Sequence, residues 1–266
     1  MELFTMLFDK IEQASPPHPP VIALAGGGGK STTLYRLAES AARRGKNVLI
    51  TTTTKMFDPR IDPTARFHRC FIGETVVPPS SEGGSITFAA DAELPELRKV
   101  KGYERDRIGE FRRDYDLIIV EADGAKRLPL KAPGSQEPQI PACTTHIIAV
   151  IGLDSYEAPM DENHVHRPEC FASLTGCRPE CPVTAEHYYR LATHSEGAFK
   201  SAPPHARRFL LFNKLDVLNK DRAIHLKESL ERLFLRSEGG EKGIEVLLGS
   251  MMAKDERAQI MDCLRK

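Results

Sequence analysis

Four consecutive glycines, followed by a lysine and two hydroxyl residues, stand near the start of the chain. The run is Gly26, Gly27, Gly28, Gly29, Lys30, Ser31 and Thr32. Glycines let backbone N–H groups curl around phosphate oxygens because no Cβ stands in the way. A lysine at this place reaches the β- and γ-phosphates of a nucleotide, and a serine hydroxyl after it binds Mg²⁺. The pattern predicts a phosphate-binding loop in which Lys30 is also catalytic.

The loop departs from the common G-x-x-x-x-G-K-[ST] form. The first glycine of that form would stand five residues before Gly29, where this chain has Leu24. The loop has instead the shortened pattern G-G-x-G-K-S. We expect a strand at residues 21–25 before it and a helix at residues 31–44 after it, and the helix N-terminus adds a positive dipole end. A glycine-rich turn that precedes a lysine by chance is the alternative.

Two acids follow the apolar run at residues 116–120. Glu121 and Asp123 are two residues apart, so both lie on one side of an extended chain. The carboxyl ends of strands are where α/β sheets bind ligands, and carboxylates bind Mg²⁺ directly or through water. We predict that both acids are metal ligands and catalytic groups, and that Gly124 brings an N–H to the γ-phosphate. An acidic turn after a core strand is the alternative.

A third motif, Asn213-Lys214-Leu215-Asp216, follows the apolar run at residues 208–212. In guanine-nucleotide proteins the Asp of an N-K-x-D motif accepts hydrogen bonds from the guanine N1–H and 2-amino group. Adenine has neither donor at these places, so the contact discriminates between the bases. We predict that Asn213, Lys214 and Asp216 bind the base, and that GTP is preferred over ATP. Four common residues also recur by chance.

Four threonines, Thr51–Thr54, end the expected second strand at residues 47–52. A hydroxyl from Thr53 or Thr54 is a candidate ligand for Mg²⁺ or the γ-phosphate, as in the switch segments of GTPases, and we assign the metal to Thr54. Ordinary β-strand threonines are the alternative.

Two other clusters are candidates for binding a second ligand. A basic segment closely follows the acids and suits an anionic substrate: Lys126, Arg127 and Lys131. Three cysteines follow further on, and their spacing is not that of a zinc finger: Cys170, Cys177 and Cys181. Solvated loop charges and ordinary free thiols are the alternatives.

Composition limits the classes of partner. The chain has 266 residues with 37 basic and 37 acidic side chains, so no overall basic field favours nucleic acid or an anionic membrane. No apolar run approaches the roughly 20 residues of a membrane span, and the N-terminus does not resemble a signal peptide. We expect a cytoplasmic protein whose six cysteines are not in disulfides.

The order of apolar and helical segments predicts an α/β fold with a mostly parallel sheet and helices on both faces. Residues 1–20 are expected to form a helix and a proline-rich linker, and residues 21–266 a single α/β domain of the P-loop NTPase type. Within it, residues 160–205 are expected to be a small insert of short helices. Strands are expected at 116–120, 146–151, 208–212 and 244–248, and helices at 104–113, 219–235 and 252–265.

These segments together resemble the YqeC family, accessory proteins of selenium-dependent molybdenum hydroxylases. The resemblance spans about residues 17–220, and it rests on Gly26–Thr32, Thr51–Thr54, Val120–Ala125, Leu128–Pro133, Glu137-Pro138 and His166–Pro168. The block from Glu121 to Pro133 is its most specific part. The resemblance implies a client, either a molybdenum hydroxylase or its cofactor.

A wider similarity concerns GTPases that assist nickel insertion into urease and hydrogenase. Those proteins also carry Glu-x-x-Gly and Asn-Lys-x-Asp motifs, which are Glu121–Gly124 and Asn213–Asp216 in this chain. The similarity implies a metallocentre-maturation protein that forms a homodimer around nucleotide.

The sequence leaves three functions open. The first is a slow Mg²⁺-dependent NTPase whose nucleotide state switches the segments 51–60 and 121–133. The second is an ATP- or GTP-dependent kinase or transferase that modifies a cofactor. The third is a nucleotide-regulated carrier of selenium or a metal that uses the cysteines.

Overall fold

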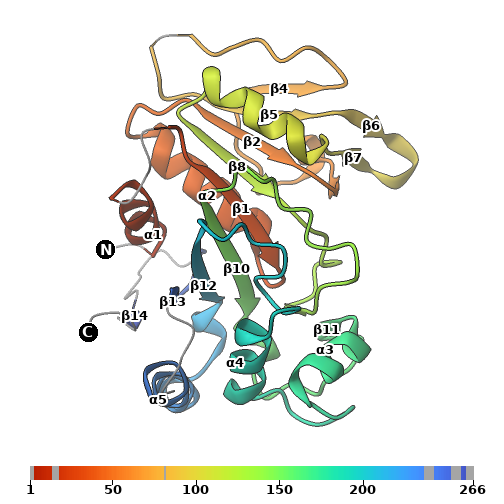
Figure 1. The fold of residues 1–266 in the computed structure, drawn as a ribbon, viewed down its shortest axis with the longest axis vertical. Coiled ribbons are helices and arrows are strands. Elements are labelled where there is room, and N and C mark those ends of the chain that lie inside the picture. Colours follow the sequence, from red (N-terminus) through yellow and green to blue (C-terminus); the bar gives the residue numbers. More distant parts are fainter. Residues whose placement is uncertain (1–2, 14–17, 81, 237–242, 253–258, 262–266) are drawn as a thin grey trace.

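The computed structural model describes residues 3–13, 18–80, 82–236, 243–252 and 259–261, and it is built around one large sheet (Figure 1). In these residues the sheet has nine strands, in the spatial order β14 (Gln259–Met261), β13 (Ile244–Leu248), β12 (Arg207–Asn213), β10 (His146–Gly152), β1 (Val21–Gly26), β8 (Leu117–Glu121), β2 (Val48–Thr52), β5 (Ile86–Ala90) and β4 (Arg69–Ile72). Eight of them are parallel, and only β14 runs antiparallel, on β13.

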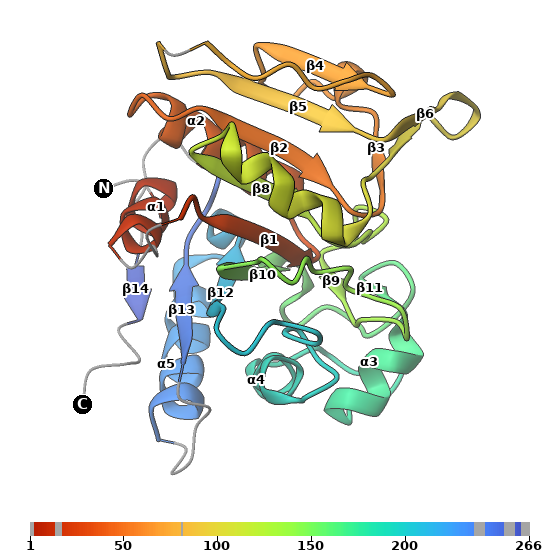
Figure 2. The same cartoon turned by 45° about the horizontal axis from the view of Figure 1, so that its top comes forward.

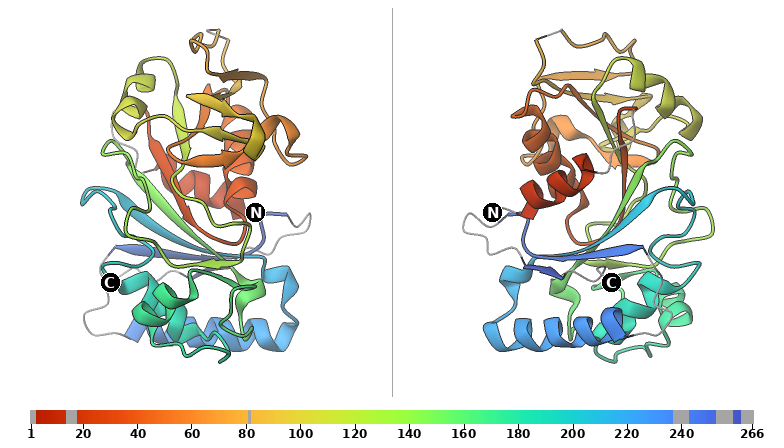
Figure 3. Two further views of the ribbon diagram at one scale, coloured as in Figure 1. Left: turned by 90° about the vertical axis from the view of Figure 1, so that its right-hand side faces the viewer. Right: turned by 60° about the vertical axis from the view of Figure 1, so that its left-hand side comes forward.

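Helices cover both faces of the sheet (Figure 3). On one face, α1 (Leu3–Glu12) and α2 (Lys30–Ala42) pack with side chains such as Leu24 and Ile148. The other face is covered by η3 (Arg105–Arg113), α4 (Ala185–Thr193) and α5 (Lys220–Arg236). Because both faces are covered, the central strands are apolar runs rather than alternating patterns, as the sequence indicated.

Several short elements surround the main sheet. Residues after β2 form a second, antiparallel sheet from β3 (Lys55–Phe57), β7 (Lys99–Lys101) and β6 (Ala92–Leu94). A parallel pair, β9 (Leu130–Lys131) and β11 (Val165–His166), lies beyond the arrowhead of β1 beside α3 (Pro168–Thr175) (Figure 2). The remaining turns of 3₁₀ helix are η1 (Pro59–Ile61), η2 (Pro95–Leu97), η4 (Leu153–Ser155) and η5 (Leu215–Val217).

The segment expected as an insert, residues 160–205, lies between β10 and β12 and contains β11, α3 and α4. It shares a hydrophobic cluster with the sheet, because Phe171 and Tyr188 are buried with side chains of β10 and β12. None of the helices in the described parts of the chain has both the length and the apolar character that a bilayer crossing needs.

Two expected helices differ from the structure. Residues 105–113 form a 3₁₀ helix in which Ile108 and Phe111 are buried, and this spacing of three matches the three residues per turn of that helix. The helix expected at 252–265 is wrong at residues 259–261, which pair with β13 as β14. Backbone pairing with an exposed sheet edge is a long-range effect that local helical periodicity does not report. Most of the rest of that expected helix lies outside the described residues.

We expect the protein to lose folding stability as the pH is lowered, because of His146 at the start of β10. The ring is buried, its Nδ1 is 2.8 Å from the Thr145 hydroxyl, and its Nε2 has no hydrogen-bond partner among the described residues. Burial, reinforced by Arg207, lowers the pKa of His146 from 6.5 to about 4. Between these values the unfolded chain binds more protons than the folded one, so stability is lost as the pH falls, by roughly 3 kcal/mol at pH 4.

Urea unfolding between pH 7 and 4.5 measures this effect. His146→Gln should lose less stability over that range than wild type, whereas His205→Gln, at an exposed position, should follow wild type. Identical pH profiles for wild type and His146→Gln would contradict the assignment.

Candidate functional site

The glycine loop and the two acids lie side by side because β1 and β8 are adjacent parallel strands. Leu24 pairs with Glu121 in the register of these strands, and on the other side Gly26 pairs with Val150 of β10. The carboxyl ends of the three strands therefore meet at one edge of the sheet, where the loop begins. This is the edge at which open α/β sheets bind their ligands.

Two loop glycines are required by the backbone and by close packing. Gly28 has φ +75°, and a Cβ there would lie 2.1 Å from the Gly152 nitrogen. Gly29 has φ +121°, and a Cβ there would lie 2.3 Å from the Asn213 amide nitrogen. A side chain at Gly28 would push away the backbone of Gly152, and one at Gly29 would push away the Asn213 amide of the N-K-x-D motif. The run of glycines is thus needed to seat the loop between β10 and the end of β12.

The backbone N–H groups of the loop fall into two sets. Gly27 donates to the Val150 carbonyl at 2.9 Å, and Gly28 donates to the Leu128 carbonyl at 3.0 Å. The N–H groups of Gly29, Lys30 and Ser31 have no acceptor among the residues that the structure describes. They stand at the N-terminus of α2, where the helix dipole favours an anion. The second set is available to phosphate oxygens.

Lys30 is held by buried oxygens at the loop. Its Nζ lies 2.7 Å from the Gly26 carbonyl oxygen and 3.1 Å from Asp123 Oδ1. The other carboxylate oxygen of Asp123 accepts the Gly26 N–H at 3.0 Å and lies 2.8 Å from Lys131 Nζ. Lys30, Asp123 and Lys131 are all buried. One carboxylate therefore joins the loop backbone to two lysines.

The electrostatics of the site keep a cation beside the loop. Burial by itself lowers the pKa of Lys30, but Asp123 and then Glu121 outweigh it and hold that pKa above its usual value. Burial is the main reason that the pKa of the Glu121 carboxyl is raised, against the opposing pull of Lys30. A cation that is charged and desolvated interacts strongly with an incoming anion.

The Ser31 hydroxyl and the Glu121 carboxylate are the pair that fits a magnesium ion. They are 3.2 Å apart, Ser31 Oγ to Glu121 Oε2, at the start of α2 and the end of β8. No group of three His, Cys, Asp or Glu side chains suited to a metal occurs in the described residues. Two protein oxygens fit Mg²⁺, which keeps several waters and takes other ligands from phosphates.

The other residues expected at the metal and phosphate have different surroundings. The carboxylate of Asp123 lies with the two lysines rather than with Ser31. The Thr54 hydroxyl lies 3.4 Å from the Thr52 hydroxyl. The Thr52 hydroxyl in turn donates to the Glu121 carbonyl at 2.9 Å, so Thr52 links Thr54 to Glu121. The Gly124 carbonyl accepts from Lys131 at 2.6 Å, and Thr32 is half-buried in the first turn of α2.

The N-K-x-D motif is joined to the glycine loop through Asn213. Its side-chain Nδ2 donates to the Gly28 carbonyl at 2.9 Å, and its Oδ1 accepts the Met251 N–H at 2.9 Å. Asp216 accepts a hydrogen bond from the Ser250 hydroxyl, and its own N–H donates back to that hydroxyl at 3.2 Å. The structure therefore brings the loop, the motif and the residues after β13 into one cluster.

Ser250 and Met251 were not singled out from the sequence. They follow β13, which is the parallel neighbour of β12, so their place beside Asn213 depends on strand order. The Lys214 Nζ lies 2.5 Å from Asp154 Oδ2, so its amine is paired with that carboxylate.

The basic segment after the acids is divided in the structure. Lys131 is buried against Asp123 and Glu137, so it does not face solvent as a substrate-gripping group would. Lys126 and Arg127 are exposed, and the Arg127 guanidinium lies 4.6 Å from the centre of the Phe57 ring.

The three cysteines of the insert do not form a metal site in the described residues. The Cys177 side chain is buried, and burial raises the pKa of its thiol, which disfavours the reactive thiolate. Cys170 and Cys181 are partly exposed and free.

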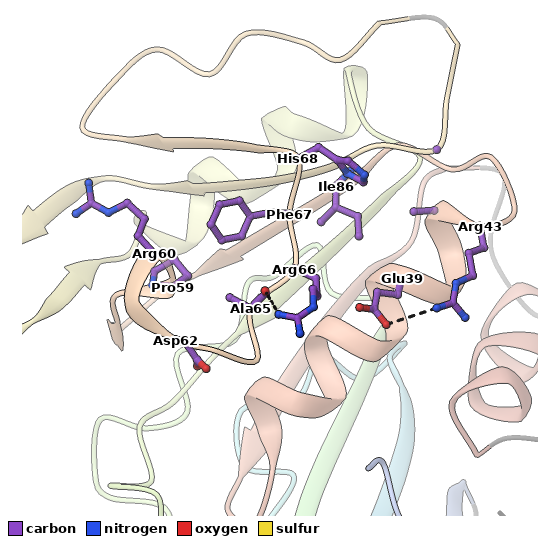
Figure 4. Close-up of a pocket in the computed structure, with 12 residues that line it drawn as sticks. Glu39, Arg43, Pro59, Arg60, Asp62, Ala65, Arg66, Phe67, His68 and Ile86 are labelled. Carbon is purple, nitrogen blue, oxygen red and sulfur yellow. Dashed lines mark hydrogen bonds and ion pairs between the residues drawn. The ribbon is translucent and has the colours of Figure 1, made fainter. Parts of the chain in front are cut away.

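A separate cavity of about 550 Å³ lies between α2 and the loop after β3 (Figure 4). It is lined by Glu39 of α2 and Arg43 directly after it, by residues 59, 60, 62 and 65–68, and by Ile86 at the start of β5. The guanidinium of Arg66 there donates to the Pro63 and Ala65 carbonyls of its own loop. The cavity shares no residue with the glycine loop and is a separate feature of the surface.

The fold and the site define the class of this protein: an α/β protein with the parallel sheet and strand-loop-helix arrangement of P-loop NTPases. The family model of the YqeC protein matches residues 22–169, and the chain belongs to the YqeC family. Uncharacterized protein YqeC of Escherichia coli K12 is 34% identical over 191 residues, which cover 71% of this chain and 73% of that protein. No solved structure matches the chain.

We expect Gly28→Ala to destabilise the protein much more than Gly45→Ala. Both glycines have positive φ, +75° and +79°, so an alanine is strained at either one. Only at Gly28 does the added Cβ meet backbone, whereas nothing lies within 4 Å at Gly45. Strain alone costs roughly 1 kcal/mol, and overpacking adds about 1–3 kcal/mol.

Denaturant unfolding of the two variants measures the difference. Equal losses in free energy of unfolding would show that the loop relaxes away from Gly152, and would contradict the packing argument.

Proposed function

We propose that the protein binds a magnesium nucleoside triphosphate at the glycine loop and hydrolyses it slowly. The observation that carries this proposal is the convergence at one sheet edge of a buried, charged lysine and a helix N-terminus whose first N–H groups have no acceptor among the described residues. The Ser31–Glu121 oxygen pair lies at the same edge. Phosphates need the cation and the N–H donors, and Mg²⁺ needs the oxygens.

In the proposed reaction, each residue has a part that its surroundings support. Lys30 turns from Asp123 to the β- and γ-phosphates and balances charge that develops in the transition state. The N–H groups of Gly29, Lys30 and Ser31 hold phosphate oxygens in place. Ser31 and Glu121 would hold Mg²⁺, which supplies further positive charge to the phosphates when bound. Catalysis is then mainly positioning and electrostatic stabilisation.

The proposed base is guanine, and Asp216 is the residue that selects it. Its carboxylate is oriented by the Ser250 hydroxyl, and the preceding motif residue Asn213 is anchored on the glycine loop. A carboxylate with a fixed direction rejects a base that lacks its two donors, because burying it unpaired is costly.

We propose that the physiological role is maturation of a selenium-dependent molybdenum hydroxylase or its cofactor. This part rests on membership of the YqeC family and on the resemblance of the block from Glu121 to Pro133. A slow nucleotide cycle suits such a role, since each nucleotide state offers a different affinity for the client. A homodimer around the nucleotide is part of the same proposal.

We expect Lys30→Ala to weaken binding of magnesium GTP by about 100-fold or more, because charge-assisted contacts to the phosphates are lost. Isothermal titration calorimetry measures the change. Lys55→Ala, at an exposed lysine after the second strand, should bind as wild type does. Absence of binding of both GTP and ATP to wild type would refute the proposed function.

Base selection is tested by comparing affinities for GTP and ATP in wild type and in Asp216→Ala. Wild type should prefer GTP by at least about tenfold, which is roughly 1.4 kcal/mol, and the variant should bind both alike. Ser250→Ala should give an intermediate ratio, and Val217→Ala, at an exposed position, should leave the ratio unchanged. Equal affinities in wild type would show that Asp216 does not read the base.

A further inference from the structure

Five charged side chains form a continuous series from the glycine loop into the insert. Lys30 lies 3.1 Å from Asp123, Asp123 lies 2.8 Å from Lys131, and Lys131 lies 2.7 Å from Glu137. The same oxygen of Glu137 lies 2.7 Å from the guanidinium of Arg167. The series begins at α2 and ends at Arg167, the N-cap residue of α3.

The middle of this series is shielded from water. The side chains of Asp123 and Lys131 are 2% and 1% exposed, whereas those of Glu137 and Arg167 are 23% and 29% exposed. A buried charge needs a partner, since an unpaired one loses its hydration without compensation. Lys131 has two carboxylate partners and the Gly124 carbonyl, so its position depends on how strongly each one attracts it.

The backbone of β9, which carries Lys131, is hydrogen-bonded to the insert. Leu130 donates to the His164 carbonyl at 3.2 Å, and Ala132 donates to the His166 carbonyl at 3.2 Å. These bonds join β9 to β11, and α3 begins two residues after β11. A shift of β9 therefore moves the start of α3 unless these hydrogen bonds break.

We propose that Lys131 is a positioning residue that keeps Asp123 paired when nucleotide draws Lys30 away, and that it thereby couples nucleotide occupancy to β11 and α3. This inference rests on the proposed function. Asp123 has two cations within 3.1 Å. When Lys30 turns to phosphate, Lys131 becomes the main cation beside Asp123. The Gly26 N–H still fixes the direction of the Asp123 carboxylate.

The change at Asp123 reaches the insert because Lys131 is shared. As Lys131 is drawn more strongly to Asp123, its hold on Glu137 weakens, and Glu137 is left to Arg167. A ligand shifts a conformational equilibrium only through contacts that differ between the two states. The differing contact in this proposal is the Lys30–Asp123 ion pair at 3.1 Å, which Lys30 gives up when it turns to phosphate.

Hydrogen–deuterium exchange of the full chain, with and without saturating Mg²⁺ and a non-hydrolysable GTP analogue, tests the coupling. In wild type, peptides that cover residues 162–176 should change their exchange rate at least about twofold on binding. Glu137→Gln and Arg167→Gln should bind the analogue within about threefold of wild type but lose that change. These positions are half-buried, so their substitution disturbs the fold less than a change at the buried Lys131, which pairs with both Asp123 and Glu137.

Two further variants make the test specific. Lys131→Arg keeps the positive charge and should retain the change in exchange, whereas Lys131→Gln should lose it. Arg190→Gln is the matched control, because Arg190 of α4 donates to the Thr175 carbonyl at the end of α3 and pairs with Glu186 of its own helix, but lies outside the series. It should respond to nucleotide as wild type does.

The outcomes separate the two proposals. If calorimetry shows no nucleotide binding to wild type, the proposed function fails, and the coupling fails with it. If wild type binds the analogue but residues 162–176 do not respond, the coupling alone is overturned. A response that persists in both Glu137→Gln and Arg167→Gln also overturns it.

Discussion

The site depends on the hydrogen bond and the ion pairs that the Asp123 carboxylate makes. This carboxylate accepts the Gly26 N–H where β1 enters the loop, and it pairs with Lys30 from α2 and with Lys131 from β9. Three separate segments of chain thus converge on one buried anion. Removing it would leave the buried ammonium group of Lys30 without the carboxylate that pairs with it and would leave Lys131 with Glu137, a change of the kind that is strongly destabilising. The glycine loop keeps its shape because this anion and the packing against β10 act together.

The parallel sheet determines which motifs meet. β1 lies between β8 and β10, and β12 and β13 follow β10. The glycine loop, the two acids and the N-K-x-D motif therefore lie at the same edge of the sheet, where these parallel strands end. Asn213 joins two of these motifs directly through the Gly28 carbonyl. The same order brings Ser250 beside Asp216, although the two are 34 positions apart in the chain. The candidate site is therefore a property of strand order as much as of its motifs.

Much of the central fold was predictable because its strands are continuous apolar runs, and the expected strands at 116–120, 146–151, 208–212 and 244–248 agree with the structure to within about a residue at most ends. The helix predicted from local periodicity is wrong at β14, because this segment pairs with the edge of β13. The ion-pair partners of Lys131 also could not be predicted from the sequence. Its neighbours Lys126 and Arg127 share its charge, but only Lys131 lies on β9 and is turned into the buried site.

The sequence by itself determined the chemistry that is present: a glycine loop with its lysine, two acids after a strand, and an N-K-x-D motif, each recognisable because short-range spacing sets the local backbone. Tertiary structure alone decided which of these groups touch. The carboxylate of Asp123 lies with Lys30 and Lys131, whereas the carboxylate of Glu121 lies beside the Ser31 hydroxyl. The physical reason is that burial makes each charge take the nearest opposite charge, and that neighbour is supplied by strands and loops distant in the sequence.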